Sequence, residues 1–358
     1  MKIEDLSVGF KVPCLNPENK DEVIKCEILA IDSLNQRFYV HYNNLNRRYD
    51  VWVSGKNFIL NKPEDIEHPK KKKKNEDKKL QNKIDEESKI RNFNTITLGE
   101  YQMNTWYFSP YPKDVIKNGD VFICQFCLFY FHSKELLSKH CDYCELRSPP
   151  GLMIYRDIER DLAFFEVDGF KQVNYCRNLA LLSKLFLDHK SLIYDVDAFL
   201  FFVLCKKTSI GWKIVGYFSK EKASEMGYNL ACILTLPCEQ RMGYGKILID
   251  FSYMLSRQDN LISGPEKPLS DLGLLSYRAY WLEIILEIIR ESNEINVKEM
   301  SLRSHIAEDD IVGTLIANKM IKYHQDNLII TLDEKCKIKM DLGRKHRVYE
   351  KYLIKDKY

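Results

Sequence analysis

A glycine-rich turn near the middle of the chain has the form of a phosphate-binding loop. An apolar run, Leu234–Leu236, ends at Pro237, and the turn that follows consists of Gln240, Arg241, Met242, Gly243, Tyr244, Gly245 and Lys246. Because Gly243 and Gly245 have no Cβ atom, backbone N–H groups there can approach a phosphate closely. A helix that starts at this turn adds unpaired donors and the positive end of its dipole. The turn suits a pyrophosphate, although an ordinary tight turn has the same pattern.

The turn departs from two common nucleotide loops. Lys246 is followed by Ile247, so the Ser or Thr that binds magnesium in a Walker loop is absent. A dinucleotide fold needs three spaced glycines, and the turn has only Gly243 and Gly245. The sequence therefore indicates a phosphate-bearing cofactor of another kind.

A second cluster has the composition of a metal site. Its spacing is Cys-x2-Cys-x12-His-x3-Cys, and the four residues are Cys124, Cys127, His140 and Cys144. Helical spacing would place His140 and Cys144 on one face of a helix that starts near Ser133. Two close cysteines with a later His/Cys pair predict a closed, structural zinc site rather than four unrelated core residues. Two further residues are spare candidates for the ligand set, His132 and Cys141.

The elements around these motifs alternate between strands and helices. Strands are expected at Ala163–Val167, Ala198–Leu204, Lys213–Lys220 and Asn229–Leu236, and amphipathic helices at Gly245–Arg257 and Ser276–Glu291. The tail, Val297–Leu332, is expected to form helix, turn, helix and then the strand Leu328–Leu332, an order that resembles a winged helix. Its near-neutral charge favours a packing role over DNA binding.

The first 60 residues or so have the pattern of a small β-barrel. Strands are expected at Val23–Ile31, Arg37–Tyr42 and Tyr49–Val53. Four aromatic residues follow this pattern, namely Tyr39, Tyr42, Tyr49 and Trp52. They could cage a methylated lysine through cation–π attraction or fill the barrel's core, and we expect core positions for at least two of them.

Charge and composition limit the class of protein. The chain of 358 residues suggests two or three folded units, and no apolar run approaches the roughly 18 residues of a membrane span. The acidic start lacks the apolar region of a secretory signal, and eleven cysteines, an odd number, indicate reduced thiols or a metal site.

Of the net charge of +3, the segment Lys70–Arg91 contributes +5 and the rest −2. The Lys-rich segment is expected to be a flexible linker that meets a polyanion or serves solubility alone.

Several longer stretches resemble the MYST family of histone acetyltransferases. They are Asn178–Asp197 (NLALLSKLFLDHKSLIYDVD), Gly216–Lys222 (GYFSKEK), Ala231–Pro237 (ACILTLP) and Gly264–Trp281 (GPEKPLSDLGLLSYRAYW). The turn at Gln240–Gly245 is similar to the acetyl-CoA loop of the N-acetyltransferase superfamily, and the N-terminal barrel looks like the chromo barrel, or tudor-knot, of the subgroup that includes the catalytic subunit of the nucleosomal histone H4 acetyltransferase complex. One local departure is Ser148, where a histidine is usual.

The resemblance implies an α/β (α+β) fold with an N-acetyltransferase-type core. Its expected parts are a chromo barrel at 1–61, a Lys-rich linker at 62–89, and an acetyltransferase domain at 90–358, divided into a zinc finger at 121–146, an acetyl-CoA core at 155–275 and a winged-helix-like tail at 276–358. It also implies a role for individual residues. The general base would be Glu266, with Cys232 in the active site, Lys190 acetylated by the enzyme itself, and the cofactor held by Ile233, Leu234, Thr235, Ser270 and the turn Gln240–Lys246.

The expected reaction is transfer of acetyl from acetyl-CoA to lysines of nucleosomal histone tails, chiefly histone H4, in the nucleus. A lysine amine with a pKa near 10.4 is only about one part in 2,500 neutral at pH 7, so a carboxylate such as Glu266 is needed to take its proton. Direct attack by lysine is favoured over an acetyl-cysteine on Cys232, which is also suited to a buried strand. Other complex subunits are expected as partners, with nucleic acid contact through the barrel and Lys70–Lys74. The alternative is a catalytically dead, chromatin-binding scaffold.

Overall fold

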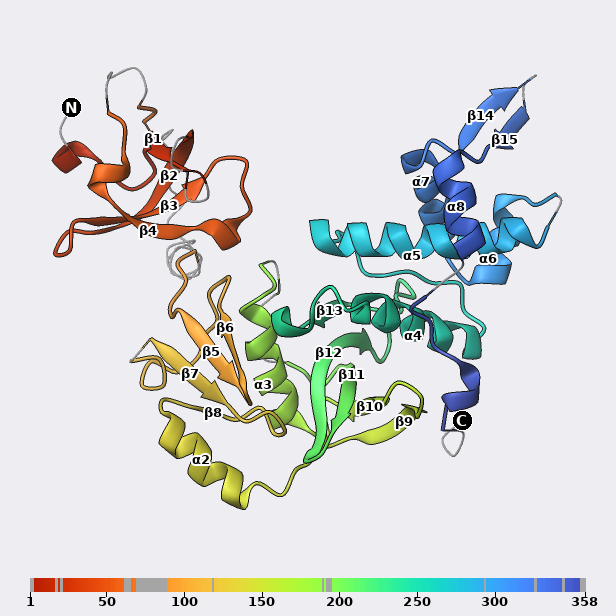
Figure 1. The fold of residues 1–358 in the computed structure, drawn as a ribbon, viewed down its shortest axis with the longest axis horizontal. Helices are drawn as coiled ribbons and strands as arrows, with labels where there is room; N and C mark the ends of the chain where they lie inside the picture. Colours follow the sequence, from red (N-terminus) through yellow and green to blue (C-terminus); the bar gives the residue numbers. More distant parts are fainter. Residues whose placement is uncertain are drawn as a thin grey trace. The chain divides into compact units, whose positions relative to one another are not determined.

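The computed structural model divides the chain into two compact units (Figure 1). The first contains Met1–Ile123, Tyr130–Leu137 and Leu181–Lys190, and the second contains Cys124–Phe129, Ser138–Ala180 and Ser191–Tyr358. The structure describes residues 3–16, 19, 22–60, 66–68, 89–117, 119–188, 190, 195–292, 294–324, 327–342 and 345–354. Most of the expected linker at 62–89, including Lys70–Lys74, lies outside the described residues.

The first unit begins with a four-stranded antiparallel sheet. Its order is β1 (Lys11–Leu15), β2 (Val23–Asp32), β3 (Arg37–Tyr42) and β4 (Val51–Ser54), with the 3-10 helices η1 (Ile3–Asp5), η2 (Arg47–Tyr49) and η3 (Gly55–Asn57). Alternate residues fill the core, so that Val12, Cys14, Cys26 and Ile28 are fully buried. The strands predicted here are confirmed, but Tyr49 lies in η2 because Asn46 caps that turn by accepting from the Arg48 N–H.

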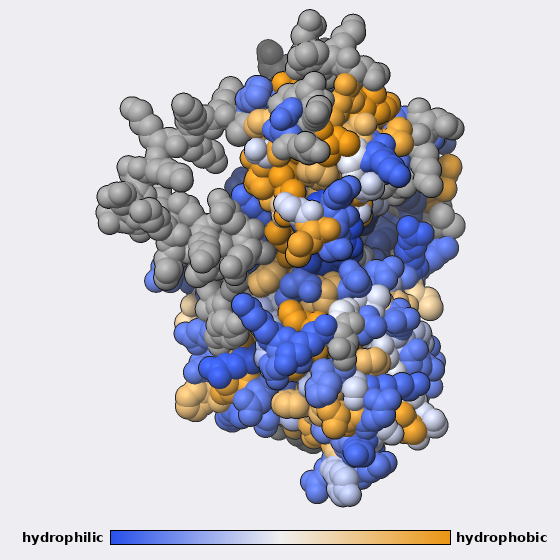
Figure 2. All heavy atoms as spheres, turned by 90° about the vertical axis from the view of Figure 1, so that its left-hand side faces the viewer, coloured by the Kyte–Doolittle hydropathy of each residue, from blue (hydrophilic) through white to orange (hydrophobic). Residues whose placement is uncertain are grey.

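The barrel's aromatic residues divide between the core and the surface. Tyr39 and Tyr42 are only 2% and 1% exposed, which confirms a core position for two of the four. Trp52 is 36% exposed, and its ring is tilted against that of Tyr39 with 5.4 Å between the centroids. The guanidinium carbon of Arg37 lies over the Trp52 ring, 5.6 Å from its centroid. Leu34 of the barrel is also exposed, and Figure 2 shows hydrophobic and hydrophilic residues side by side, with hydrophobic residues gathered in the upper part of this face. The core role of Tyr39 and Tyr42 leaves no fully exposed cage of four rings.

A second sheet of the first unit has the order β6-β5-β7-β8. These strands are β5 (Thr95–Leu98), β6 (Tyr101–Asn104), β7 (Asp120–Ile123) and β8 (Tyr130–Phe131), and β5 and β7 run parallel. The helix α2 (Lys134–Tyr143) follows β8. Because β7 ends at Ile123, the first two predicted metal ligands come directly after it.

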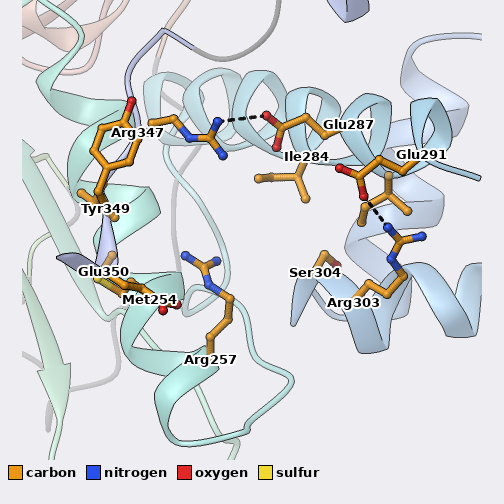
Figure 3. Close-up of a pocket in the computed structure, with 12 residues that line it drawn as sticks. Met254, Arg257, Ile284, Glu287, Glu291, Arg303, Ser304, Arg347, Tyr349 and Glu350 are labelled. Atoms are coloured by element: carbon orange, nitrogen blue, oxygen red, sulfur yellow. Dashed lines mark hydrogen bonds and ion pairs between the residues drawn. The ribbon is translucent and has the colours of Figure 1, made fainter. Parts of the chain in front are cut away.

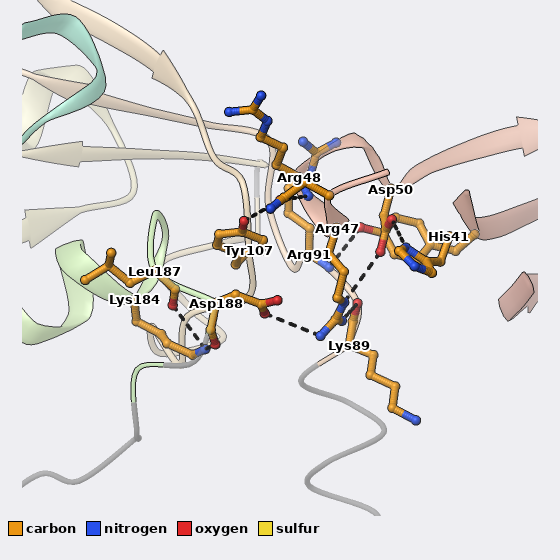
Figure 4. A network of polar contacts seen from close by, with 12 residues as sticks. His41, Arg47, Arg48, Asp50, Lys89, Arg91, Tyr107, Lys184, Leu187 and Asp188 are labelled. Carbon is orange, nitrogen blue, oxygen red and sulfur yellow. Dashed lines mark hydrogen bonds and ion pairs between the residues drawn. The ribbon is translucent and has the colours of Figure 1, made fainter. Parts of the chain in front are cut away.

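A polar network joins the barrel to neighbouring segments of the first unit (Figure 4). Arg47 donates to the Lys89 carbonyl at 2.9 Å and pairs with Asp188 at 3.4 Å and Asp50 at 3.7 Å. Asp50, buried in the barrel, also contacts His41 Nδ1 at 2.8 Å. Burial raises the pKa of Asp50, and the neighbouring His41 and Arg47 reduce the size of this shift. Arg47 is therefore the shared partner of two carboxylates from different segments.

The second unit is built on a five-stranded antiparallel sheet of order β13-β12-β11-β10-β9. The strands are β9 (Leu152–Asp157), β10 (Leu162–Asp168), β11 (Phe199–Thr208), β12 (Gly211–Glu221) and β13 (Cys232–Thr235). The helices are α4 (Tyr244–Gln258), α5 (Asp271–Arg290) and α3 (Val173–Lys184), whose last residues, from Leu181 on, belong to the first unit. The core lies where α4 meets the sheet: Phe251 stacks on Phe164 at 3.8 Å, and Phe202 on Phe218 at 4.8 Å. The mixed α/β architecture is as predicted.

The tail continues with short elements. They are α6 (Val297–Ser304), α7 (Glu308–Ala317), the hairpin β14 (Ile321–His324) and β15 (Asn327–Ile330), α8 (Glu334–Leu342) and the 3-10 helix η7 (Glu350–Tyr352). Two helices followed by a hairpin confirm the winged-helix-like order. None of the helices within the described ranges is long and apolar enough to cross a membrane.

Candidate active site and metal centre

The four predicted metal ligands converge in the second unit. The ligand atoms of Cys124, Cys127, His140 and Cys144 all lie within 4.8 Å of one another. Cys127 Sγ is 3.2 Å from His140 Nε2, and Cys124 Sγ is 3.9 Å from Cys144 Sγ. Tetrahedral zinc with Zn–S bonds near 2.3 Å separates two sulfurs by about 3.8 Å. Both the donor set and its spacing therefore fit a structural zinc ion.

Local structure explains why these side chains meet. Cys124 and Cys127 occupy a tight turn after β7, in which the Leu128 N–H donates to the Cys124 carbonyl at 2.9 Å. His140 lies on α2, and the Cys144 N–H donates to its carbonyl at 2.8 Å, so both face one side as predicted. The hydrogen bond between the two thiols lowers the pKa of Cys124 and raises the pKa of Cys127, so that Cys124 is the first of this pair to ionise. The spare candidates His132 and Cys141 are exposed and outside this group.

The glycine-rich turn joins β13 to α4 and is held at its start. The 3-10 helix η6 (Pro237–Glu239) leads into it, and the buried carboxylate of Glu239 pairs with Lys213 of β12 at 3.0 Å. Gln240 Nε2 donates to the Thr235 carbonyl at 3.2 Å. These contacts fix the approach of the chain to α4 from the edge of the sheet.

The turn itself uses left-handed backbone at two positions. Gly243 is the N-cap of α4 with φ of +86°, and Arg241 has φ of +65°. Among the described residues no side chain caps the helix, and the Lys246 N–H donates to the Gly243 carbonyl at 3.1 Å. The preceding N–H groups, those of Tyr244 and Gly245, are the ones with which this helix end could bind a phosphate. Lys246 pairs with Glu283. The structure thus places the predicted pyrophosphate loop at the N-terminus of α4.

One contact at this loop was missed by the sequence analysis. The imidazole of His346 lies against Gly243: a Cβ on that glycine would be only 2.3 Å from its Nδ1 and Cε1. Burial, followed by the charge of Lys246, lowers the pKa of His346. No motif marks a lone histidine 103 positions after Gly243, so only the folded chain reveals the pair.

The strand β13 carries Cys232 and the residues predicted to face the thioester. Cys232, Ile233 and Thr235 are half-buried, whereas Leu234 is 4% exposed and belongs to the core. The Tyr217 hydroxyl of β12 lies 3.8 Å from Cys232 Sγ. Cys232 therefore lies on a partly accessible face of the strand that leads to the glycine-rich turn.

The loop with Glu266 runs beside the residues that precede Cys232. The Glu266 N–H donates to the Leu230 carbonyl at 2.8 Å, and the Asn229 N–H donates to the Gly264 carbonyl at 3.0 Å. The side chain of Glu266 is exposed. Two residues far apart in the sequence, Glu266 and Cys232, are thereby carried by adjacent backbone segments.

Two further predicted residues have clear local roles. Ser270 is the N-cap of α5, and its hydroxyl accepts from the Gly273 N–H at 3.1 Å. Lys190 is half-buried at the end of the first unit, just after the segment in which Lys184 Nζ donates to the carbonyls of Leu187 and Asp188. The expected role of Ser270 in cofactor binding and that of Lys190 in self-acetylation stay predictions.

A separate cavity of about 360 Å³ lies among α4, α5, α6 and residues 347–350 (Figure 3). Its arginines face carboxylates: Arg303 pairs with Glu291 at 2.6 Å, and Arg347 with Glu287 at 3.7 Å. The charges in this cavity are thus balanced by the protein itself, and it includes none of the predicted cofactor residues.

Comparison with known proteins places the chain in a family. Residues 148–358 match the MOZ/SAS family, residues 90–144 the MYST family zinc finger domain, and residues 6–60 the Tudor-knot, described as an RNA binding activity-knot of a chromodomain. Histone acetyltransferase of the MYST family 2 from Arabidopsis thaliana is 43% identical over 358 residues, which cover 92% of this chain and 80% of the relative. Histone acetyltransferase ESA1 from Saccharomyces cerevisiae is 39% identical over 397 residues, which cover 93% and 88%. The chain therefore belongs to the MYST family of histone acetyltransferases, enzymes that take their acetyl group from acetyl-CoA.

Proposed function

We propose that the chain acetylates lysines of nucleosomal histone tails, chiefly histone H4, by direct attack of the lysine on acetyl-CoA. The observation that carries the mechanism is the hydrogen bond from the Glu266 N–H to the Leu230 carbonyl, 2.8 Å long, because it holds the backbone of Glu266 beside the segment that leads into β13 and the predicted acetyl-CoA loop. The names of the relatives support histones as the substrate.

The proposed step moves two protons and one acyl group. Glu266 accepts the first proton from the substrate lysine ammonium, and the neutral amine attacks the thioester carbon. The new C–N bond forms while the C–S bond breaks, and the second proton lost by the lysine nitrogen passes to the departing sulfur of CoA. Deprotonation of a free lysine at pH 7 costs roughly 4.6 kcal/mol, so a general base in hydrogen-bond reach contributes directly to turnover.

The acetyl-CoA loop would bind the pyrophosphate through the backbone donors of Gln240–Lys246, and the half-buried residues Ile233 and Thr235 of β13 would line the thioester. Cys232 would line the same pocket without forming a bond to the acetyl group. Zinc, held by the three cysteines and His140, would stabilise the finger segment and takes no part in the transfer. Its closed four-ligand set leaves no position for a substrate.

Beyond the reaction, we propose action on chromatin in the nucleus as the catalytic subunit of a complex. The tudor-knot match supports nucleic acid contact through the barrel, and Lys70–Lys74 would extend that contact. A pull-down of the full chain followed by mass spectrometry would identify the other subunits. Recovery of the chain without chromatin proteins would contradict this part.

The mechanism is tested by two substitutions assayed with labelled acetyl-CoA and a histone H4 tail peptide. Glu266→Gln keeps the shape of the side chain and loses its proton affinity, so turnover should fall by about 10²- to 10⁴-fold while acetyl-CoA binding is unchanged. Cys232→Ala should retain near-wild-type turnover at saturating acetyl-CoA. Complete loss in Cys232→Ala with an intact fold would establish the acetyl-cysteine route instead, and full turnover in Glu266→Gln would exclude Glu266 as the base.

A further inference from the structure

The loop that carries Glu266 is contacted on both sides of that residue by one buried carboxylate. Asp310 lies in the first turn of α7 and is 7% exposed. Its Oδ1 accepts from Lys267 Nζ at 2.7 Å. Its Oδ2 occupies the space beside Gly264, where an added Cβ would come within 2.8 Å of it. Asp310 therefore contacts the loop both before and after Glu266.

The main chain supports the same loop from two directions. On one side, the Asn229 N–H donates to the Gly264 carbonyl, and the Leu230 carbonyl accepts from the Glu266 N–H. On the other side, the Ser263 N–H donates to the His305 carbonyl at 3.0 Å, in the turn between α6 and α7. After Glu266, the next contact between the loop and α7 is the Lys267–Asp310 ion pair. The pair thus holds the loop to α7 on the C-terminal side of Glu266.

The energetics favour a persistent pair. The Lys267 side chain is 49% exposed, whereas that of Asp310 is 7% exposed. A buried carboxylate without a partner is costly, and Asp310 Oδ2 has no hydrogen-bond partner among the residues that the structure describes. Lys267 is therefore the main charge that compensates Asp310, and its release would leave the carboxylate uncompensated.

We propose that Asp310 and Lys267 are positioning residues that hold Glu266 at the substrate lysine. This inference rests on the proposed function, because it assumes that Glu266 is the base. A catalytic group displaced by about 1 Å can lose 10²-fold in rate. Loosening the loop on one side should therefore lower kcat without changing how acetyl-CoA binds at the separate glycine-rich turn. The close approach of Asp310 Oδ2 also explains why position 264 is a glycine, because a Cβ there would lie only 2.8 Å from this oxygen.

The test uses Lys267→Gln, because that side chain is half-exposed and its replacement should fold. Lys351→Gln is the matched control, since Lys351 is also exposed and pairs with a carboxylate, Glu159, at 3.2 Å on another part of the core. Lys267→Gln should lower kcat by about threefold to tenfold, with the KM for acetyl-CoA equal to that of Lys351→Gln. Its Tm should lie below that of Lys351→Gln, because the buried carboxylate of Asp310 loses its partner. Lys267→Arg keeps charge and reach and should restore most of kcat. Asp310→Asn should lower kcat at least as much.

A combined variant separates positioning from a general structural role. In the Glu266→Gln background, Lys267→Gln should cause no further fall in turnover, because there is no base left to position. An equal fold-loss in both backgrounds, or a kcat for Lys267→Gln equal to that of Lys351→Gln, would overturn the inference alone. Full turnover in Glu266→Gln by itself would overturn the proposed mechanism first, and this inference with it.

Discussion

Replacing Gly243 by alanine is expected to damage the acetyl-CoA loop for two separable reasons. The first is conformational: φ at Gly243 is +86°, and a left-handed backbone costs a residue with a Cβ roughly 1–2 kcal/mol. The second is steric: the new Cβ would lie 2.3 Å from two atoms of the His346 imidazole, so this ring must move. Gly245 provides the contrast, because a Cβ there would meet only Thr235 Oγ1 at 3.7 Å, an ordinary contact.

The magnitude follows from the backbone term. The alanine variant must adopt the left-handed conformation at position 243 in order to bind acetyl-CoA. If the whole backbone cost of about 1–2 kcal/mol is taken from the free energy of binding, the affinity falls roughly fivefold to thirtyfold. The collision with His346 adds a repacking cost of about 1–3 kcal/mol. Gly245→Ala should leave the Tm unchanged, so any loss of acetyl-CoA affinity in that variant reports how closely a phosphate approaches the backbone.

The assay is titration calorimetry with acetyl-CoA, together with thermal denaturation, on four variants. They are Gly243→Ala, Gly245→Ala, His346→Ala and the double variant Gly243→Ala/His346→Ala. The double variant removes the collision and should bind acetyl-CoA more tightly than Gly243→Ala, but still more weakly than His346→Ala because the backbone cost remains. Wild-type Kd and Tm in Gly243→Ala would refute both parts of the reasoning, and a double variant no better than Gly243→Ala would refute the steric part.

Three other outcomes are expected. Purified, reduced protein should contain about one zinc per chain, and Cys127→Ser or His140→Ala should lower the Tm because metal binding contributes folding free energy; metal analysis that finds no zinc would contradict this. Peptide mapping should find Lys190 acetylated in active protein and unmodified in Glu266→Gln, and an unmodified lysine in fully active enzyme would exclude a required role. Neutralising Lys70–Lys74 should weaken nucleosome binding and flatten its salt dependence; an equal loss of activity on a free histone peptide would show that the segment acts on catalysis instead.

Local signals in the sequence predicted the elements that carry the site. The helix expected at Gly245–Arg257 is α4, Tyr244–Gln258, because its apolar periodicity spans the whole buried face. The helix expected from Ser276 begins at Asp271 instead, since Ser270 caps it through the Gly273 N–H. All four zinc ligands were predicted from their spacing, and the structure brings them together.

Long-range contacts could not be predicted in the same way. The strand expected at Asn229–Leu236 is shorter, Cys232–Thr235, because Asn229 and Leu230 bond instead to the loop of Gly264 and Glu266. His346 beside Gly243 and Asp310 beside Gly264 depend on packing between distant segments. Neither side chain stands in a motif, so only the folded backbone indicates its role.

Arg47, which pairs with both Asp50 and Asp188, connects the barrel with the segment that precedes Lys190. Asp188 is two residues before Lys190, while Asp50 belongs to the barrel, and Arg47 contacts both. Coupling between sites is reciprocal. A ligand of the barrel that separated Arg47 from Asp188 would change the free energy of the segment before Lys190, and a change in that segment would alter the barrel's affinity for the ligand by the same factor. Since the pair is partly exposed, such coupling would weaken as ionic strength rises, so barrel binding and the proposed acetylation of Lys190 are best compared at one salt concentration.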